Sequence, residues 1–132
     1  MPAPPRLRQL RRDNNVYSLL MNTVRLNLEA DERTARHPHL RDAPDAELRH
    51  LQEVARRWMV LAAGYVMRRH RCSPEVAVRL VQELEMELRH DTPEAELRAV
   101  PLEEVLVIPD ELLPPALRSG AAPSPPFAAP AP

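Results

Sequence analysis

Lysine is absent from this chain, so all 18 of its Lys and Arg positions are arginine. Glycine is almost absent as well, since only Gly64 and Gly120 occur. Two isolated glycines are too few for the tight primed turns of β-hairpins, and they cannot form a glycine-rich phosphate loop. The sequence therefore argues against a β-rich fold and against a nucleotide site of the P-loop or dinucleotide-binding kind.

Aromatic residues and cysteine are scarce too. Trp58, Tyr17, Tyr65 and Phe127 are the only Trp, Tyr or Phe residues, so the core has to be built from Leu, Val, Ala and Met. The single cysteine, Cys72, cannot form a disulfide within the chain, and the first residues carry no apolar stretch of the secretory type. These features predict a protein of a reducing compartment, most simply the cytoplasm.

No apolar run is long enough to cross a membrane. The longest, residues 59–67, has about half of the roughly 20 residues that a spanning helix needs, so we expect a buried helix segment and no membrane partner. The prolines lie mostly at the two ends and between apolar periodic runs. This distribution predicts a flexible basic arm at 1–13, a helical domain at 14–113 and a disordered Pro/Ala tail at 114–132.

Helical periodicity is the strongest pattern that is present. Apolar residues recur at steps of three and four over 14–30 and, most clearly, over 44–70. A serine cap followed by proline starts a third helix, 73–90, and similar chemistry starts a short fourth one, 92–100. The expected fold is an all-α bundle of three main helices, with the long central one at 44–70, plus the short fourth helix. We interpret the apolar run 105–108 as a strap across this bundle.

Charge is segregated along the chain. Residues 1–72 hold fourteen arginines and eight acidic residues, a net of plus six. Residues 73–132 hold four arginines and eleven acidic residues, a net of minus seven. The overall charge of −1 argues against strong non-specific binding to nucleic acid, whereas the segregation favours a charged contact surface.

Arginine also clusters on one face of the predicted central helix. At about 100° per residue, five arginines of this helix fall opposite Trp58 and its apolar neighbours. These are Arg49, Arg56, Arg57, Arg68 and Arg71, to which the basic arm adds Arg6, Arg8, Arg11 and Arg12. Guanidinium groups suit phosphate oxygens and carboxylates, so we predict a surface for phosphates or for an acidic partner. The alternative is a solvated face, or one satisfied by the acidic half of the same chain.

Some apolar residues lie outside the expected core faces. The apolar arc of the first helix takes in Leu19 and Leu26 and is wider than one neighbouring helix covers. Val60 and Met67 lie within the arginine sector of the central helix, and apolar groups in such a place indicate a covered surface. We therefore predict a homodimer with Leu19, Leu26, Val60 and Met67 at its interface.

Two Glu-x-x-His pairs, Glu47 with His50 and Glu87 with His90, are the remaining candidates for chemistry. Such pairs occur in the di-iron sites of ferritin-like bundles, but here both lie at helix ends and the further glutamates of those sites are missing. Cys72 has arginines nearby, which favour a thiolate, but it has no certain base. We predict no catalytic residue, no metal and no cofactor.

The expected function is that of a non-enzymatic helical interaction module. It is a small regulatory or adaptor protein of a bacterium or phage, a homodimer that acts through contacts with an unidentified protein partner. The alternative is a nucleic-acid-binding protein whose arginine face and basic arm contact phosphates. An enzyme or metalloprotein built on the two Glu-x-x-His pairs is a third hypothesis.

Overall fold

The computed structural model describes residues 3–113, which form six α-helices and two 3₁₀ helices without a strand among them. The helices are α1 (Leu7–Arg11), α2 (Asn14–Arg36), α3 (Ala46–His70), α4 (Pro74–Asp91), α5 (Glu94–Arg98) and α6 (Leu102–Val105), with η1 (Pro38–Arg41) and η2 (Asp110–Leu112) as the 3₁₀ helices. The predicted all-α bundle of three main helices with a long central one is confirmed, and α5 is its short fourth helix. The predicted tail, 114–132, lies outside the described residues.

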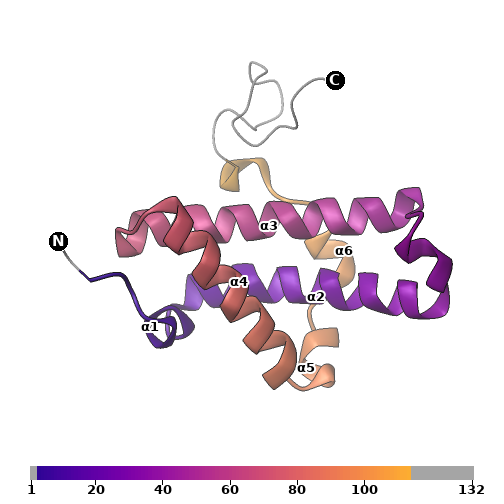
Figure 1. The fold of residues 1–132 in the computed structure, drawn as a ribbon, viewed down its shortest axis with the longest axis horizontal. Helices are drawn as coiled ribbons and strands as arrows, with labels where there is room; N and C mark the ends of the chain where they lie inside the picture. The colour runs from indigo at the N-terminus through magenta and orange to yellow at the C-terminus, as the bar shows by residue number, and fades with distance from the viewer. Residues whose placement is uncertain (1–2, 114–132) are drawn as a thin grey trace, which may run out of the picture.

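Helices α2 and α3 lie side by side and antiparallel along the long axis of the molecule (Figure 1). Asp13 caps α2 by accepting hydrogen bonds from the backbone N–H groups of Asn15 and Val16, and Asp45 caps α3 through the N–H of Leu48. Helix α2 continues to Arg36, six residues beyond its predicted end. It stops there because His37 precedes a proline and adopts a non-helical conformation.

Helix α4 crosses the α2–α3 pair obliquely and closes the first of two apolar cores (Figure 1). Ser73 caps this helix and Pro74 occupies its first turn, as the sequence predicts. The first core joins α4 to the start of α2 and the end of α3. Its largest fully buried members are Leu10, Leu20, Leu84, Leu88, Val16, Val24, Val66 and Val81.

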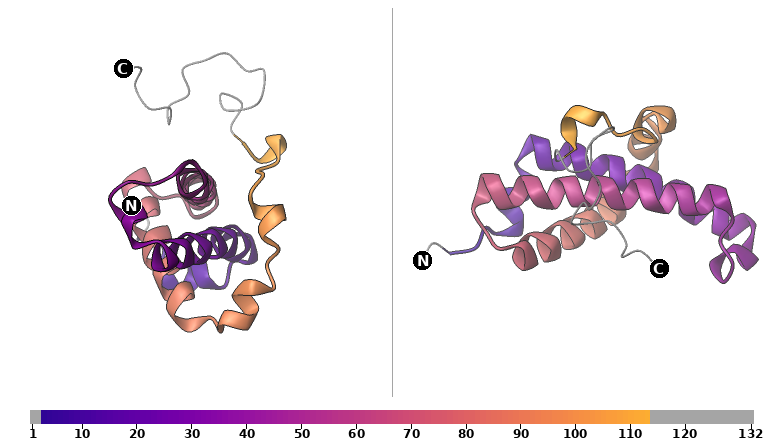
Figure 2. Two further views of the ribbon diagram at one scale, coloured as in Figure 1. Left: turned by 90° about the vertical axis from the view of Figure 1, so that its right-hand side faces the viewer. Right: turned by 90° about the horizontal axis from the view of Figure 1, so that it is seen from above.

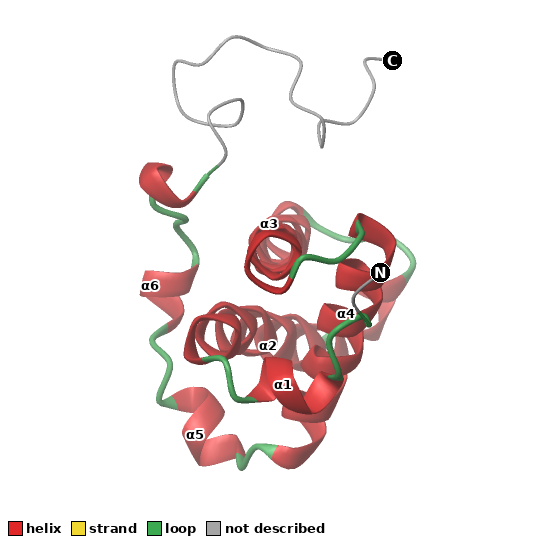
Figure 3. Cartoon of the chain, turned by 90° about the vertical axis from the view of Figure 1, so that its left-hand side faces the viewer, coloured by secondary structure: helices red, strands yellow, loops and turns green. Residues whose placement is uncertain are grey.

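The second core lies at the other side of α2 and α3, beneath residues 99–113, which we call the strap. From α5 the strap runs past α2 and along α3, so that the helix pair lies between α4 and the strap (Figures 2 and 3). Val105 of the strap is buried, and its carbonyl accepts a 2.8 Å hydrogen bond from the indole Nε1–H of Trp58. The strap predicted from the run 105–108 is therefore present, and it includes the helical turn α6.

The prediction of a flexible arm at 1–13 is wrong for its second half. Residues 7–11 form α1, and Leu10 is fully buried in the first core. Arg11 adds ion pairs to Glu87 at 3.2 Å and to Asp91 at 3.3 Å on α4. The three-residue spacing of Leu7 and Leu10 is compatible with a helix, but the arginines and prolines around them favoured a flexible segment.

Candidate functional site

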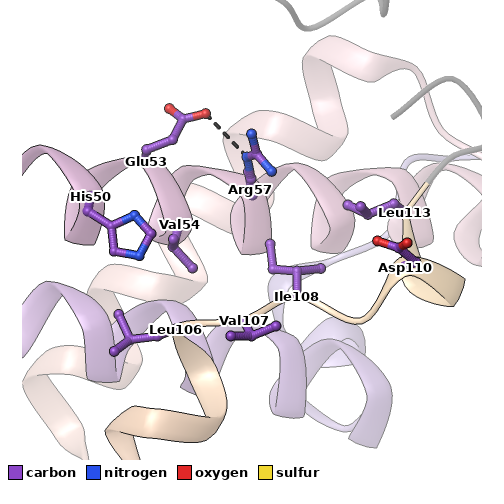
Figure 4. A pocket seen from close by; sticks show the side chains of 9 residues that line it. All are labelled: His50, Glu53, Val54, Arg57, Leu106, Val107, Ile108, Asp110 and Leu113. Carbon is purple, nitrogen blue, oxygen red and sulfur yellow. Dashed lines mark hydrogen bonds and ion pairs between the residues drawn. The ribbon is translucent and has the colours of Figure 1, made fainter. Parts of the chain in front are cut away.

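A groove of about 350 Å³ lies between α3 and the strap (Figure 4). It is lined by His50, Glu53, Val54 and Arg57 from α3 and by Leu106, Val107, Ile108, Asp110 and Leu113 from the strap. Helix α3 places residues 50, 53, 54 and 57 on one face because they are three or four positions apart. The strap contributes its side chains from the extended segment that follows α6 and from η2.

The groove has an apolar floor and a charged rim. Glu53 accepts hydrogen bonds from Arg56 at 2.6 Å and from Arg57 at 3.3 Å, and the bond from Arg56 is the main cause that lowers the pKa of Glu53. The lining residues include no serine, threonine, cysteine or lysine that could act as a nucleophile. This arrangement suits the binding of an apolar side chain flanked by polar groups.

Two large apolar side chains remain exposed on the strap. Val107 is 68% exposed at the groove and Leu112 is 47% exposed beside it. The backbone N–H groups of Val107 and Ile108 make no hydrogen bond within residues 3–113. An extended segment of another protein would therefore find apolar contacts and one main-chain donor here, since the N–H groups of successive residues in an extended chain point to opposite sides.

The predicted arginine face of α3 is exposed, and Trp58 points into the core as expected. The arginines of its first half are nonetheless engaged in hydrogen bonds or ion pairs within the chain. Arg49 donates to the carbonyl of Pro44, at 2.9 Å from its Nη2 atom, while Arg56 and Arg57 both pair with Glu53. The face is therefore not a continuous row of available guanidinium groups.

Five unpaired arginines gather at one end of the bundle, which faces the viewer in Figure 3 and which we call the basic end. It consists of Arg8 and Arg12 from α1 and its C-terminal flank, and of Arg68, Arg69 and Arg71 from the end of α3. All five are exposed, and none has an ion-pair partner among residues 3–113. Sequence reasoning selected four of them; Arg69 was missed because helical spacing places it near the apolar side of α3.

The other two predicted arginines of the arm differ in their environment. Arg11 is engaged with Glu87 and Asp91, so a partner or phosphate that contacts it has to displace these ion pairs. Arg6 is exposed just before α1, and its backbone N–H donates to Gln9 at 2.8 Å.

The four residues predicted for a subunit interface are all at least partly buried within the chain. Leu26 is fully buried in the second core, so it is a core residue of this chain and not an interface residue. Leu19 packs partly against both cores. The wide apolar arc of α2 is covered by α3, α4, α5 and α6 of the same chain, which removes the reason for a second subunit at this helix. Met67 packs partly against the first core, and Val60 is half-buried.

The remaining candidates for chemistry are not assembled into a site. Glu47 pairs with Arg33 and Glu87 with Arg11, on different parts of the surface. Among residues 3–113, no three His, Cys, Asp or Glu side chains lie close enough together to hold a metal ion. Burial raises the pKa of the Cys72 thiol, which disfavours the thiolate form.

Sequence reasoning missed a buried polar network between α2 and α4. Glu85 is 4% exposed, and its carboxylate accepts hydrogen bonds from Asn27 at 2.9 Å and from Arg89 at 2.8 Å. Arg25 is buried as well and donates from Nε to the carbonyl of Val100, at 3.0 Å, which ties the strap to α2. Arg25 in α2 and Glu85 in α4 each occupy a core-facing position, and a charged residue at such a position indicates a buried hydrogen bond.

Comparison with protein-family models, with curated proteins and with solved structures finds no match for this chain. Within residues 3–113, no helix combines the length and the apolar character that crossing a membrane requires.

Proposed function

We propose that this protein is a non-enzymatic interaction module, a small regulatory or adaptor protein that binds a segment of another protein in the groove between α3 and the strap. The single observation that carries the proposal is the groove itself, with its apolar floor, its charged rim and the exposed side chain of Val107. Apolar surface of this kind, surrounded by polar groups, is typical of protein contact sites.

The lining residues support a peptide segment as the ligand better than a small molecule. Beside the groove, the N–H groups of Val107 and Ile108 make no hydrogen bond within residues 3–113, and one of them can donate to an extended backbone that lies along the strap. The apolar residues Val54, Leu106 and Ile108 would receive its side chains.

The test is capture of partner proteins from cells that produce this protein, with two matched variants. Val107→Asp places a charge at the groove, while Met86→Asp does the same on the outer face of α4, at a residue of equal 68% exposure. We expect proteins that are retained by the unchanged chain and by Met86→Asp but lost with Val107→Asp. Equal retention by both variants would contradict the groove as the binding site.

The homodimer is part of the proposal and is tested separately. With Leu26 buried, the surface available for it is the side of α3 that carries Val60 and Met67, both partly covered already. Light scattering at two concentrations should give twice the mass of 15.0 kDa at the higher one. A mass of one chain at both concentrations would remove the dimer.

A second candidate function is binding of nucleic acid. The observation that favours it is the basic end, whose exposed arginines have no ion-pair partner within the described part of the chain. Arginine forks bind phosphate oxygens in pairs of hydrogen bonds, and this contact needs no particular base sequence. A salt-dependent affinity for DNA is the corresponding measurement.

A further inference from the structure

Two basic segments that are far apart in the sequence meet at the basic end. The carboxylate of Asp13, which follows Arg12, lies 3.0 Å from Nε2 of His70, which lies between Arg69 and Arg71. Two residues after Asp13, Asn15 donates to the hydroxyl of Tyr65, which precedes His70 by five residues, at 3.0 Å. These two contacts fix the start of α2 against the end of α3, and with them the flanking arginines.

The local charge at this end is strongly positive. Residues 6–13 contain four arginines and one acidic residue, and residues 68–75 contain three arginines and one acidic residue. The carboxylate of Asp13 pairs with His70 and caps α2, and Arg11 forms an ion pair with Glu87 of α4. The remaining arginines repel one another, although the C-terminus of α3 favours cations through its dipole. A bound polyanion would relieve this repulsion.

Arg71 adds a conformational observation. It follows α3 with φ 49° and ψ 61°, and it is the only residue other than glycine with positive φ in the described part of the chain. Glycine is the usual residue at this position after a helix, because a side chain is strained there. Arginine nevertheless occupies this strained position, which points to a functional role for its side chain.

The surroundings favour phosphates over an acidic protein surface. Among residues 3–113, the large exposed apolar side chains are those of Tyr17, Val78, Met86, Val107 and Leu112. Apart from Tyr17, none lies in the segments that form the basic end, whereas protein interfaces have an apolar centre. Tyr65 is held by Asn15, which leaves Tyr17 as the one exposed Tyr or Trp side chain among residues 3–113, whereas single-strand binders stack successive bases on several aromatic side chains.

We infer that the basic end binds the phosphate backbone of duplex DNA without reading its sequence, with Arg12, Arg69 and Arg71 as principal contacts. The inference rests on the second proposed function, nucleic-acid binding, and assigns it to this end of the bundle instead of to the whole arginine face of α3. Arg8, four residues before Arg12, extends the contact along α1, while the guanidinium of Arg68 lies back over Gly64.

The salt dependence gives the number of contacts. Each neutralised phosphate changes the slope of log affinity against log salt by about −0.9, so three or four contacts give about −3 to −4. The double variant Arg12→Ala with Arg69→Ala removes two contacts and should make the slope shallower by about 1.8. Arg36→Ala with Arg41→Ala removes the same charge from exposed arginines at the opposite end, which have no ion-pair partner among residues 3–113, and should leave the slope unchanged.

The experiment is a titration of a fluorescent mixed-sequence duplex with the full chain and the two double variants at several salt concentrations. Circular dichroism of each variant establishes that its helices are intact. Weaker binding and a shallower slope in the Arg12 and Arg69 variant alone support the inference. An equal loss in both variants overturns it while leaving nucleic-acid binding in place.

Two further outcomes also decide against the site as proposed. No binding of the duplex at low salt removes nucleic-acid binding as a function, and the inference with it. Tighter binding of a single strand, or of a polyglutamate peptide, than of the duplex would show that the basic end accepts a different anion.

Discussion

Replacing Arg71 by glycine should stabilise this protein. The residue adopts φ 49°, in the left-handed region, where a β-carbon is crowded by the backbone. Releasing that crowding contributes about 1 to 2 kcal/mol, and the greater freedom of glycine in the unfolded chain costs about 0.5 to 1 kcal/mol. The expected net gain is about 0.5 to 1 kcal/mol.

The comparison with Arg71→Ala isolates this effect. Both variants lose the same charge near the end of α3, but only alanine keeps the β-carbon in the left-handed conformation. We expect the glycine variant to unfold at a temperature about 2 to 4 °C above that of the alanine variant. Both should bind duplex DNA equally weakly, because both lack the guanidinium.

Thermal unfolding followed by circular dichroism is a suitable assay, with urea unfolding for the free energy. If the glycine variant is no more stable than the alanine variant, Arg71 is not strained after α3. Backbone strain at Arg71 would then no longer support a functional role for its side chain.

Substitutions at other residues, and changes of pH, should alter the stability of the fold by predictable amounts. Leu10→Ala should lower the free energy of unfolding in urea by about 2 to 5 kcal/mol, because Leu10 is fully buried, whereas a loose arm would show no change. Trp58→Phe leaves the buried carbonyl of Val105 without its donor and should cost about 1 to 3 kcal/mol in the same assay; an unchanged value would mean that the strap is not held there. Burial raises the pKa of Asp13, but hydrogen bonds from His70 and from the start of α2 outweigh it and leave the pKa below its ordinary value of 3.8. The hydrogen bond from Arg33 is the main cause that lowers the pKa of Asp45 to about 2. Both carboxylates therefore stabilise the fold above about pH 4, and this contribution is lost as the pH falls from about 4 to 2. Thermal unfolding across this range should show the fall, and Asp45→Asn should reduce it; an equal fall in that variant would contradict the assignment to Asp45.

The long helices could be predicted because their information is local. Spacing of apolar residues and the caps at Asp13 and Ser73 define where α2, α3 and α4 run. The placement of Trp58 in the core follows from the same spacing. The end of α2 was predicted too early because its last turns are polar, and their support comes from contacts such as that between Arg33 and Asp45.

The surfaces could be predicted only in part, because pairing between distant residues decides which charges remain available. Arg56 and Arg57 appear free on a helical projection, yet both form ion pairs with Glu53. Arg11 is engaged by α4, which no local pattern indicates. The groove itself depends on where the strap crosses α3, and that position is set by tertiary bonds such as the one from Trp58 to Val105.

The most direct test of the proposed function is hydrogen–deuterium exchange of the protein with and without a partner obtained in the capture experiment. Binding in the groove predicts slower exchange along the strap, at Val107 and Ile108 in particular, and along the facing turns of α3 between His50 and Arg57. Slower exchange confined to α4 and the basic end, with the strap unchanged, would contradict the groove as the site of protein contact.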